Sequence, residues 1–220
     1  MKKFDAPDLQ HVPLSILHYE ESFVVVDKLP HFLSVPGRHI KDCVVNRIRD
    51  LFPQAEGSLA AHRLDMETSG LMLLGLTPES HRKLSLQFEQ RLVHKTYNGL
   101  VEGVIEAEEG HIELAFRVDI DNRPMQILDP EHGKLGITDW KIIERYDTHT
   151  RLQFTPTTGR THQLRVHAAH PKGLGHPLIG DSLYGNPAEN RSRLMLHSTS
   201  LAFHHPVTDE KVKFELPAPF

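Results

Sequence analysis

The stretch that decides the fold is Ala61-His62-Arg63-Leu64-Asp65-Met66-Glu67-Thr68-Ser69-Gly70, followed by the apolar run Leu71-Met72-Leu73-Leu74-Gly75-Leu76. A short apolar run bounded by Gly70 and by Thr77-Pro78 fits a buried strand better than a helix. The polar residues before it then form a loop that places the Asp65 carboxylate beside cationic side chains at the rim of an apolar core. A single Asp in a loop is commonly a turn former or a cap, and a catalytic carboxylate is the alternative.

The composition is that of an ordinary globular protein, with 39% apolar and 25% charged residues in 220. Apolar stretches fall short of the roughly 20 residues that span a bilayer, and Met1–Pro7 lacks the apolar core of a signal peptide. Cys43 is the single cysteine, so no internal disulfide can form and nothing points to secretion. We therefore expect a cytoplasmic protein with no membrane partner.

Charge is unevenly distributed along the chain. The formal net charge of −4 argues against binding nucleic acid through overall charge alone. Residues 38–49 and 81–95 each carry four cations against one acid, whereas residues 102–121 carry seven acids and one arginine. This segregation permits a basic face for a polyanion on a mildly acidic protein, and solvated surface charge is the alternative.

The remaining patterns predict an α+β fold with a mixed, largely antiparallel central sheet and flanking helices. We predict a helix from Thr77-Pro78 to about residue 92, because His81, Leu84, Phe88 and Leu92 follow helical spacing. Residues 1–18 are expected to form a short, irregular lead-in, and residues 19–220 a single domain. Further strands are predicted over residues 23–27, 71–76, 96–101, 111–118, 138–144, 151–155, 195–203 and 211–216, and further helices over 44–52 and 161–170.

A second charged cluster is Thr158-Gly159-Arg160-Thr161-His162-Gln163-Leu164-Arg165-Val166-His167. Cations in the first turns of a helix oppose its dipole. Arg160 and Arg165 therefore suggest an anionic partner, either a phosphate or a buried carboxylate such as Asp65. A surface helix that tolerates these cations is the alternative.

Metal and nucleotide sites find little support. The 17 histidines do not form His-Glu-x-x-His, and one cysteine is too few for a Cys-rich zinc site, so scattered histidines are the better interpretation. The phosphate-binding glycine patterns are missing, and Ser69 does not lie in Gly-x-Ser-x-Gly. We expect no metal and no cofactor.

The central motif, His62-Arg63-Leu64-Asp65 with Thr68-Ser69-Gly70, resembles that of the RluA-type pseudouridine synthases. The resemblance covers about residue 18 to the C-terminus, and Leu29-Pro30-His31 departs slightly from the usual Lys-Pro-x-Gly. The short form of the chain is most similar to the subgroup that acts on both large-subunit rRNA and the tRNA anticodon loop. Further matching segments are Lys28–Pro30, Leu33–Arg38, Lys95–Tyr97, Asn122–Pro124, Gly159–His167, Gly175–Asp181 and Leu194–His197.

The resemblance implies a pseudouridine synthase fold with a catalytic cleft, and isomerisation of uridine in structured RNA. Many members of the family carry an extra N-terminal RNA-binding domain, but we expect none here because the lead-in is too short for one. Asp65 would be the essential carboxylate, Arg165 would pair with it, and Tyr97 would stack on the uracil. Asp65 could attack the sugar, add to the base or remove a sugar proton, and these alternatives stay open. On pattern alone, a core aromatic of a strand is the better interpretation of Tyr97.

The target base must be flipped out of its stack, and Arg63 resembles the residue that fills the gap. Leu64, Leu164 and Leu196 are expected to form apolar walls around the base. We expect RNA as the partner and a monomer without an obligate protein partner. A non-catalytic RNA-binding or ribosome-assembly factor on the same fold and a metal-dependent hydrolase are the rival hypotheses. The other substrate-binding candidates are His62, Arg38 and Arg160, with Lys41, Arg82 and Lys83 as further cations that could grip RNA.

Overall fold

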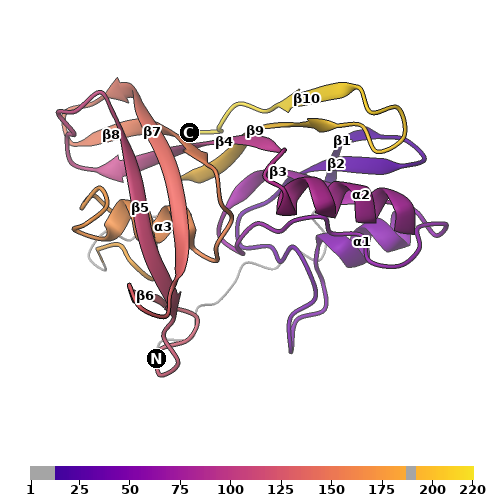
Figure 1. Cartoon of the computed structure of the whole chain (residues 1–220), viewed down its shortest axis with the longest axis horizontal. Coiled ribbons are helices and arrows are strands. Elements are labelled where there is room, and N and C mark those ends of the chain that lie inside the picture. The colour runs from indigo at the N-terminus through magenta and orange to yellow at the C-terminus, as the bar shows by residue number, and fades with distance from the viewer. Residues whose placement is uncertain (1–12, 187–191) are drawn as a thin grey trace. The chain divides into compact units, whose positions relative to one another are not determined.

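The computed structural model describes residues 13–186 and 192–220. Contacts between Cα atoms divide the chain into two compact units (Figure 1). Unit 1 comprises Met1–Val93 and Ala202–Leu216, and unit 2 comprises His94–Leu201 and Pro217–Phe220. The prediction of a single domain over residues 19–220 stays a prediction.

Unit 1 is built on strands β1 (Ser15–Tyr19), β2 (Phe23–Lys28) and β3 (Ser69–Gly75), which pair antiparallel in the order β1-β2-β3. Every residue of β3 is buried. This explains its continuous apolar sequence, because a strand covered on both faces shows no alternation. The predicted buried strand after the Asp65 loop is confirmed.

Helices α1 (Val44–Leu51) and α2 (Pro78–Glu89) complete unit 1 with β10 (Lys211–Glu215). The side chain of Cys43 caps α1 by accepting a hydrogen bond from Asn46 N, and burial raises the pKa of its thiol. Thr77 caps α2 by accepting from Ser80 N, as its position before Pro78 predicted.

The prediction for the end of α2 is wrong. The helix ends at Glu89, and Arg91 adopts a left-handed backbone with φ of 61°. The helical spacing therefore stops before Leu92, which is 48% exposed, whereas Leu84 is fully buried. Gly75 packs against the start of this helix, where a Cβ would lie 2.5 Å from His81 N.

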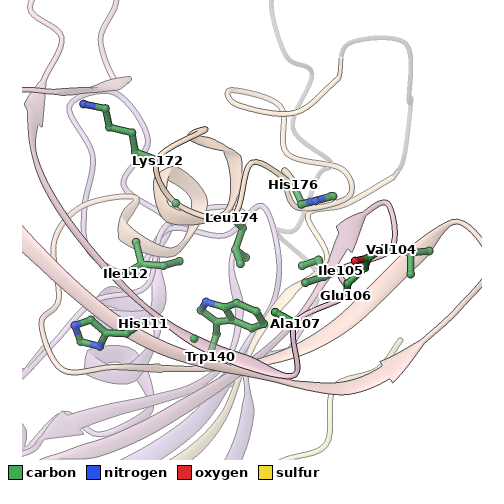
Figure 2. A pocket seen from close by; sticks show the side chains of 12 residues that line it. Val104, Ile105, Glu106, Ala107, His111, Ile112, Trp140, Lys172, Leu174 and His176 are labelled. Carbon is green, nitrogen blue, oxygen red and sulfur yellow. The ribbon is translucent and has the colours of Figure 1, made fainter.

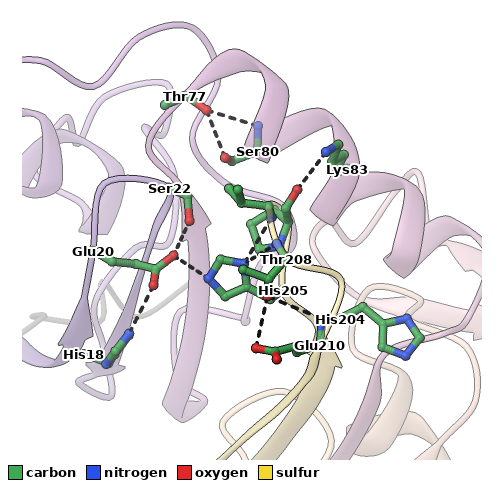
Figure 3. Close-up of polar contacts among 12 residues, drawn as sticks. His18, Glu20, Ser22, Thr77, Ser80, Lys83, His204, His205, Thr208 and Glu210 are labelled. Carbon is green, nitrogen blue, oxygen red and sulfur yellow. Dashed lines mark hydrogen bonds and ion pairs between the residues drawn. The ribbon is translucent and has the colours of Figure 1, made fainter.

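A group of polar contacts fixes the start of α2 against the turn that precedes β10 (Figure 3). The His205 ring accepts hydrogen bonds at Nδ1 from the backbone N–H groups of Val207 and Thr208. Its Nε2 therefore carries the proton, and it lies 2.8 Å from the Glu20 carboxylate. Lys83 of α2 donates to the carbonyl of Pro206, 2.8 Å away, on the same turn.

Unit 2 is built on a sheet with the strand order β4-β8-β7-β5-β6, in which every neighbouring pair is antiparallel. Strand β9 lies beside β4. Helix α3 (Gln163–Ala169) packs on β7 (Figure 1). Trp140 and Phe154 lie opposite each other on β7 and β8 and contribute to the core. The strands are β4 (His94–Glu102), β5 (Glu109–Val118), β6 (Gln126–Leu128), β7 (Lys134–Arg145), β8 (His149–Pro156) and β9 (Leu196–His204), whose last three residues belong to unit 1.

The α+β fold with a largely antiparallel sheet is confirmed, but details at its margins differ. Residues 1–12 of the expected lead-in lie outside the described residues, while Ser15–Tyr19 form β1 rather than irregular chain. Leu17 and Tyr19 of this strand have 42% and 66% of their surface exposed. The strand therefore has no continuous buried face, and its hydrophobic pattern did not predict it. Helix α3 is shorter than predicted because His162 takes a left-handed φ of 57° and cannot lie inside it.

Among the described residues, no helix combines the length and the apolar composition that a membrane span needs.

Candidate active site

The Asp65 loop turns just before β3. Thr68 N donates to the backbone carbonyl of Asp65, 3.2 Å away, and closes a tight turn over residues 65–68. Leu64 is buried, Asp65 is half-buried and Arg63 is exposed. Gly70 has a φ of +105°, a conformation that favours glycine. This explains why a glycine ends the Thr-Ser-Gly sequence.

The loop is held on one side by Ser34. The Ser34 hydroxyl donates to Leu64 O at 2.7 Å and accepts from Leu64 N at 3.1 Å. Both backbone groups of Leu64 are thus satisfied by one buried side chain. This bridge joins the Leu33–Arg38 segment to the residue that precedes Asp65.

On its other side, the loop is held by Lys28. This ammonium is fully buried and donates to the carbonyls of Leu29, Phe32 and Met66 at 2.8, 2.7 and 3.0 Å. Three carbonyl oxygens replace the water that a buried ammonium loses. The Lys-Leu-Pro segment therefore anchors Met66, the residue that follows Asp65.

His62 is fixed within unit 1. Its Nε2 accepts a hydrogen bond from Leu73 N at 3.0 Å, so the neutral ring carries its proton on Nδ1. The ring also stacks on Phe88 with centroids 4.4 Å apart. His62 was predicted to bind substrate, but its Nε2 atom is already used in a hydrogen bond that holds it to β3.

In unit 2, Tyr97 lies on β4 opposite Phe154 of β8 and is 8% exposed. Lys95 precedes it by two residues and therefore lies on the same face of the strand. Burial lowers the pKa of Lys95 to about 8. Leu164 on α3 and Leu196 on β9 are both buried.

Arg165 lies in the first turn of α3 and is 2% exposed. Its Nε and Nη2 atoms donate to the two carboxylate oxygens of Asp181 at 2.8 and 2.5 Å. The same carboxylate accepts from Leu183 N and Tyr184 N. A buried guanidinium is thus neutralised by a carboxylate that is itself fully hydrogen-bonded.

Asp181 and Tyr184 contact the predicted site residue Arg165, and the sequence reasoning singled out neither of them. The Tyr184 ring lies 5.5 Å from Arg165 Cζ, and its hydroxyl bonds to His162 Nδ1 at 2.9 Å. The signal for Asp181 was available, because a buried arginine needs a carboxylate and Asp181 ends the Gly175–Asp181 segment.

The predicted residues fall into two groups. Unit 1 holds the Asp65 loop, and unit 2 holds the Tyr97 and Arg165 group. The pairing of Asp65 with Arg165, and the apolar wall built jointly by Leu64, Leu164 and Leu196, stay predictions. Unit 1 carries Arg38, His62, Arg63, Leu64 and Asp65, and unit 2 carries Tyr97, Arg160, Leu164, Arg165 and Leu196.

Two cavities open on unit 2. One, of about 470 Å³, has a mixed lining in which Ile112 and Leu174 lie near Trp140 and His111 and Lys172 are polar (Figure 2), and no predicted site residue lines it. The other, of about 640 Å³, is lined by several cations, including the predicted Arg160. Only the second therefore involves a residue singled out for substrate binding.

His167, the second histidine of the Gly159–His167 segment, belongs to the core of unit 2. His167 is fully buried, its ring lies edge-on to Phe116, and burial lowers its pKa to about 4. It therefore stays neutral at physiological pH. Among the described residues, no three His, Cys, Asp or Glu side chains cluster so that they could hold a metal ion.

Comparisons with known proteins agree on the family. Residues 22–170 match the family described as RNA pseudouridylate synthase. The chain is 41% identical over 212 residues to the dual-specificity RNA pseudouridine synthase RluA of Pasteurella multocida, covering 94% of each chain. It is 40% identical over 210 residues to the protein of the same name from Yersinia pestis, covering 93% of this chain and 99% of that one.

Solved structures are similar as well. Human RNA pseudouridylate synthase domain containing 1 superposes with a TM-score of 0.78 at 30% identity, over 94% of this chain and 84% of that one. Human RNA pseudouridylate synthase domain containing 4 shares the fold, with a TM-score of 0.72 at 21% identity over 93% and 88% of the two chains. From the match over residues 22–170, the full-length relatives and the shared fold, we conclude that this chain belongs to the RNA pseudouridylate synthase family.

Proposed function

We propose that the chain isomerises specific uridines in large-subunit rRNA and in the tRNA anticodon stem-loop to pseudouridine. The observation that carries the proposal is the Asp65 loop, in which two segments resembling the family's motifs fix the residues on both sides of the carboxylate. The name dual-specificity RNA pseudouridine synthase of the relatives in Pasteurella multocida and Yersinia pestis supports the two RNA classes.

The reaction breaks the C–N glycosidic bond, turns the uracil and rejoins it to the sugar through carbon. We assign the essential carboxylate to Asp65. Because Ser34 and Lys28 hold Leu64 and Met66 in place, the carboxylate is positioned before the RNA arrives. Its attack on the sugar, addition to the base and removal of a sugar proton are all compatible with this geometry.

We assign supporting roles to two residues of unit 2. Arg165 is the expected partner of Asp65. Its guanidinium donates to both oxygens of Asp181, which fixes the plane of the group. Tyr97 is expected to stack on the detached uracil and to help move the proton from C5. Both side chains are largely buried, so they are ordered without substrate.

Arg63 completes the proposal on the RNA side. A base inside folded RNA must be flipped out, at the cost of a few kcal/mol of stacking. Arg63 is exposed next to Asp65, which suits a side chain that replaces the flipped base in the stack. Because rRNA and tRNA are the expected substrates, we also propose that the chain acts in the cytoplasm, as a monomer.

The test compares wild type with Asp65→Asn on unmodified tRNA and rRNA transcripts, with a chelator present. We expect pseudouridine in both RNAs with wild type and none with Asp65→Asn. Sequencing of the product identifies the modified position. Tight binding of both RNAs without product from wild type would instead favour a non-catalytic RNA-binding factor.

A further inference from the structure

The larger cavity of unit 2, which we call the basic pocket, has not been used in the reaction described above. It measures about 640 Å³ and opens between the chain around Pro124, the start of β7 and the loop before α3. This volume lies in the range of small-molecule sites, about 300 to 1,000 Å³. Among its described lining residues are no acids, but Arg117, Arg123, Lys134 and Arg160 all line it.

The four cations are not equivalent. Arg117 Nε lies 2.5 Å from the Asp129 carboxylate, so its charge is already balanced. Arg160 Nε donates to the neutral carbonyl of Leu135 at 3.1 Å. Within the described parts of the chain, Arg123, Lys134 and Arg160 have no carboxylate partner, and all three side chains are exposed. Three uncompensated positive charges around one cavity favour an anion there.

The basic pocket is connected to Arg165 within unit 2. Gln126 lines the pocket, and its backbone N–H donates to the Tyr184 hydroxyl at 2.8 Å. The Tyr184 ring in turn lies 5.5 Å from Arg165 Cζ. A single side chain, Tyr184, thus connects the pocket wall to the arginine expected to act in the reaction.

We propose that the basic pocket binds a backbone phosphate of the RNA substrate, at a nucleotide other than the target uridine. Arg123, Lys134 and Arg160 contact the phosphate, and the apolar side chains of Val118 and Pro124 contact the attached nucleoside. The inference rests on the proposed function and adds to it a second point at which the RNA is held. Phosphate contacts of this kind position an RNA without reading its sequence.

The test measures binding of an unmodified tRNA anticodon stem-loop transcript as a function of salt concentration. The double variant Arg123→Ala/Lys134→Ala is expected to raise Kd roughly tenfold or more at about 0.1 M salt. Each lost phosphate contact should reduce the slope of log Kd against log salt by about 0.7 to 1.

Lys141→Ala provides the matched control. Lys141 is exposed and lies on the same strand as Lys134, but seven residues on and therefore on the opposite face. Its salt slope should equal that of wild type. Every changed side chain is exposed, so we expect all variants to fold, and thermal unfolding checks this.

An unchanged slope in the double variant, or an equal reduction in Lys141→Ala, would overturn the proposal. Because the slope reports binding of RNA and not formation of product, it can be read whether or not pseudouridine forms. Absence of product from wild type would contradict the proposed function, whereas a reduced slope would still support the phosphate site.

Discussion

The buried pair of Arg165 and Asp181 depends on complete hydrogen bonding. Both side chains are almost fully removed from water, with exposed fractions of 2% and 1%. Such a removal is costly for either ion alone, and the mutual attraction offsets it only when the geometry is good. Here the guanidinium binds both carboxylate oxygens of Asp181, and the backbone N–H groups of Leu183 and Tyr184 also donate to Oδ1.

Replacing Asp181 with Asn is predicted to destabilise the protein by about 3 to 5 kcal/mol, because Arg165 would keep a buried charge without a counter-ion. Product formation should also fall, since the guanidinium would no longer be held in place. Urea unfolding measures the first effect, and a single-turnover assay at a temperature where the variant is folded measures the second.

The control for Asp181→Asn is Glu108→Gln. The Glu108 carboxylate pairs with Arg145 at 2.8 Å but is 77% exposed. Surface pairs of this kind contribute about 0 to 1 kcal/mol, so this variant should remain close to wild type in both measurements. A loss for Asp181→Asn no larger than that for Glu108→Gln would contradict our account of the buried pair.

At the scale of elements, the loop that carries Asp65 is ordered by contacts from segments far away in the sequence. Ser34 and Lys28 lie 30 and 38 residues before their partners Leu64 and Met66. The loop therefore inherits the rigidity of β2 and of the chain before α1. Catalytic loops that are fixed in this way need little reorganisation when the substrate binds.

Ser34→Ala is predicted to lower kcat while leaving Kd for RNA unchanged. The substitution leaves the buried N–H and C=O of Leu64 without a partner, which costs about 1 to 3 kcal/mol, and the loop can then move. Comparison of single-turnover rates with binding isotherms separates the two effects. Ser58→Ala changes an exposed serine of the same unit and should leave both parameters at their wild-type values.

Thr77→Ala is predicted to reduce the free energy of unfolding by about 1 kcal/mol, because the cap of α2 is lost. Thr77→Ser retains the hydroxyl that accepts from Ser80 N, so it should retain most of the stability. Thermal or urea unfolding of the two variants decides the matter. Equal losses for both substitutions would mean that the capping bond contributes nothing.

The sequence predicted those elements whose signals are local. The buried run of β3 and the Thr-Pro start of α2 needed no knowledge of distant residues. The half-exposed β1, the three-residue β6 and the end of α2 at Glu89 depend on strand pairing or on the left-handed backbone of Arg91, so periodicity could not show them.

The same distinction applies to the candidate site. The motifs singled out Asp65, Tyr97 and Arg165 through resemblance. The bridges from Ser34 and Lys28 and the Arg165–Asp181 pair join residues 16 to 38 positions apart, and only the folded chain shows them.

At the scale of the whole molecule, buried histidines make stability depend on pH. Burial lowers the pKa of both His167 and His197 to about 4, whereas an unfolded histidine titrates near 6.5. Between pH values of about 4 and 6.5, these two histidines bind protons in the unfolded chain but stay neutral in the folded protein. Their stabilising contribution is complete above about pH 6.5 and is lost as the pH falls toward 4.

We expect the free energy of unfolding to fall by up to about 1.4 kcal/mol per pH unit for each of these histidines across that window. Urea unfolding at about pH 7 and about pH 5 measures the loss. His167→Gln should remove one histidine's share of the slope, whatever constant offset it adds. A slope identical to that of wild type would show that His167 is protonated in the folded protein.

The cysteine that caps α1 allows the opening of this part of unit 1 to be measured chemically. Cys43 is the single thiol of the chain, is completely buried, and has its pKa raised by burial, so an alkylating reagent reaches it only after the helix start opens. The rate of alkylation in native buffer therefore counts opening events of that segment. Its dependence on urea separates local fraying of α1 from global unfolding, with no label added to the protein.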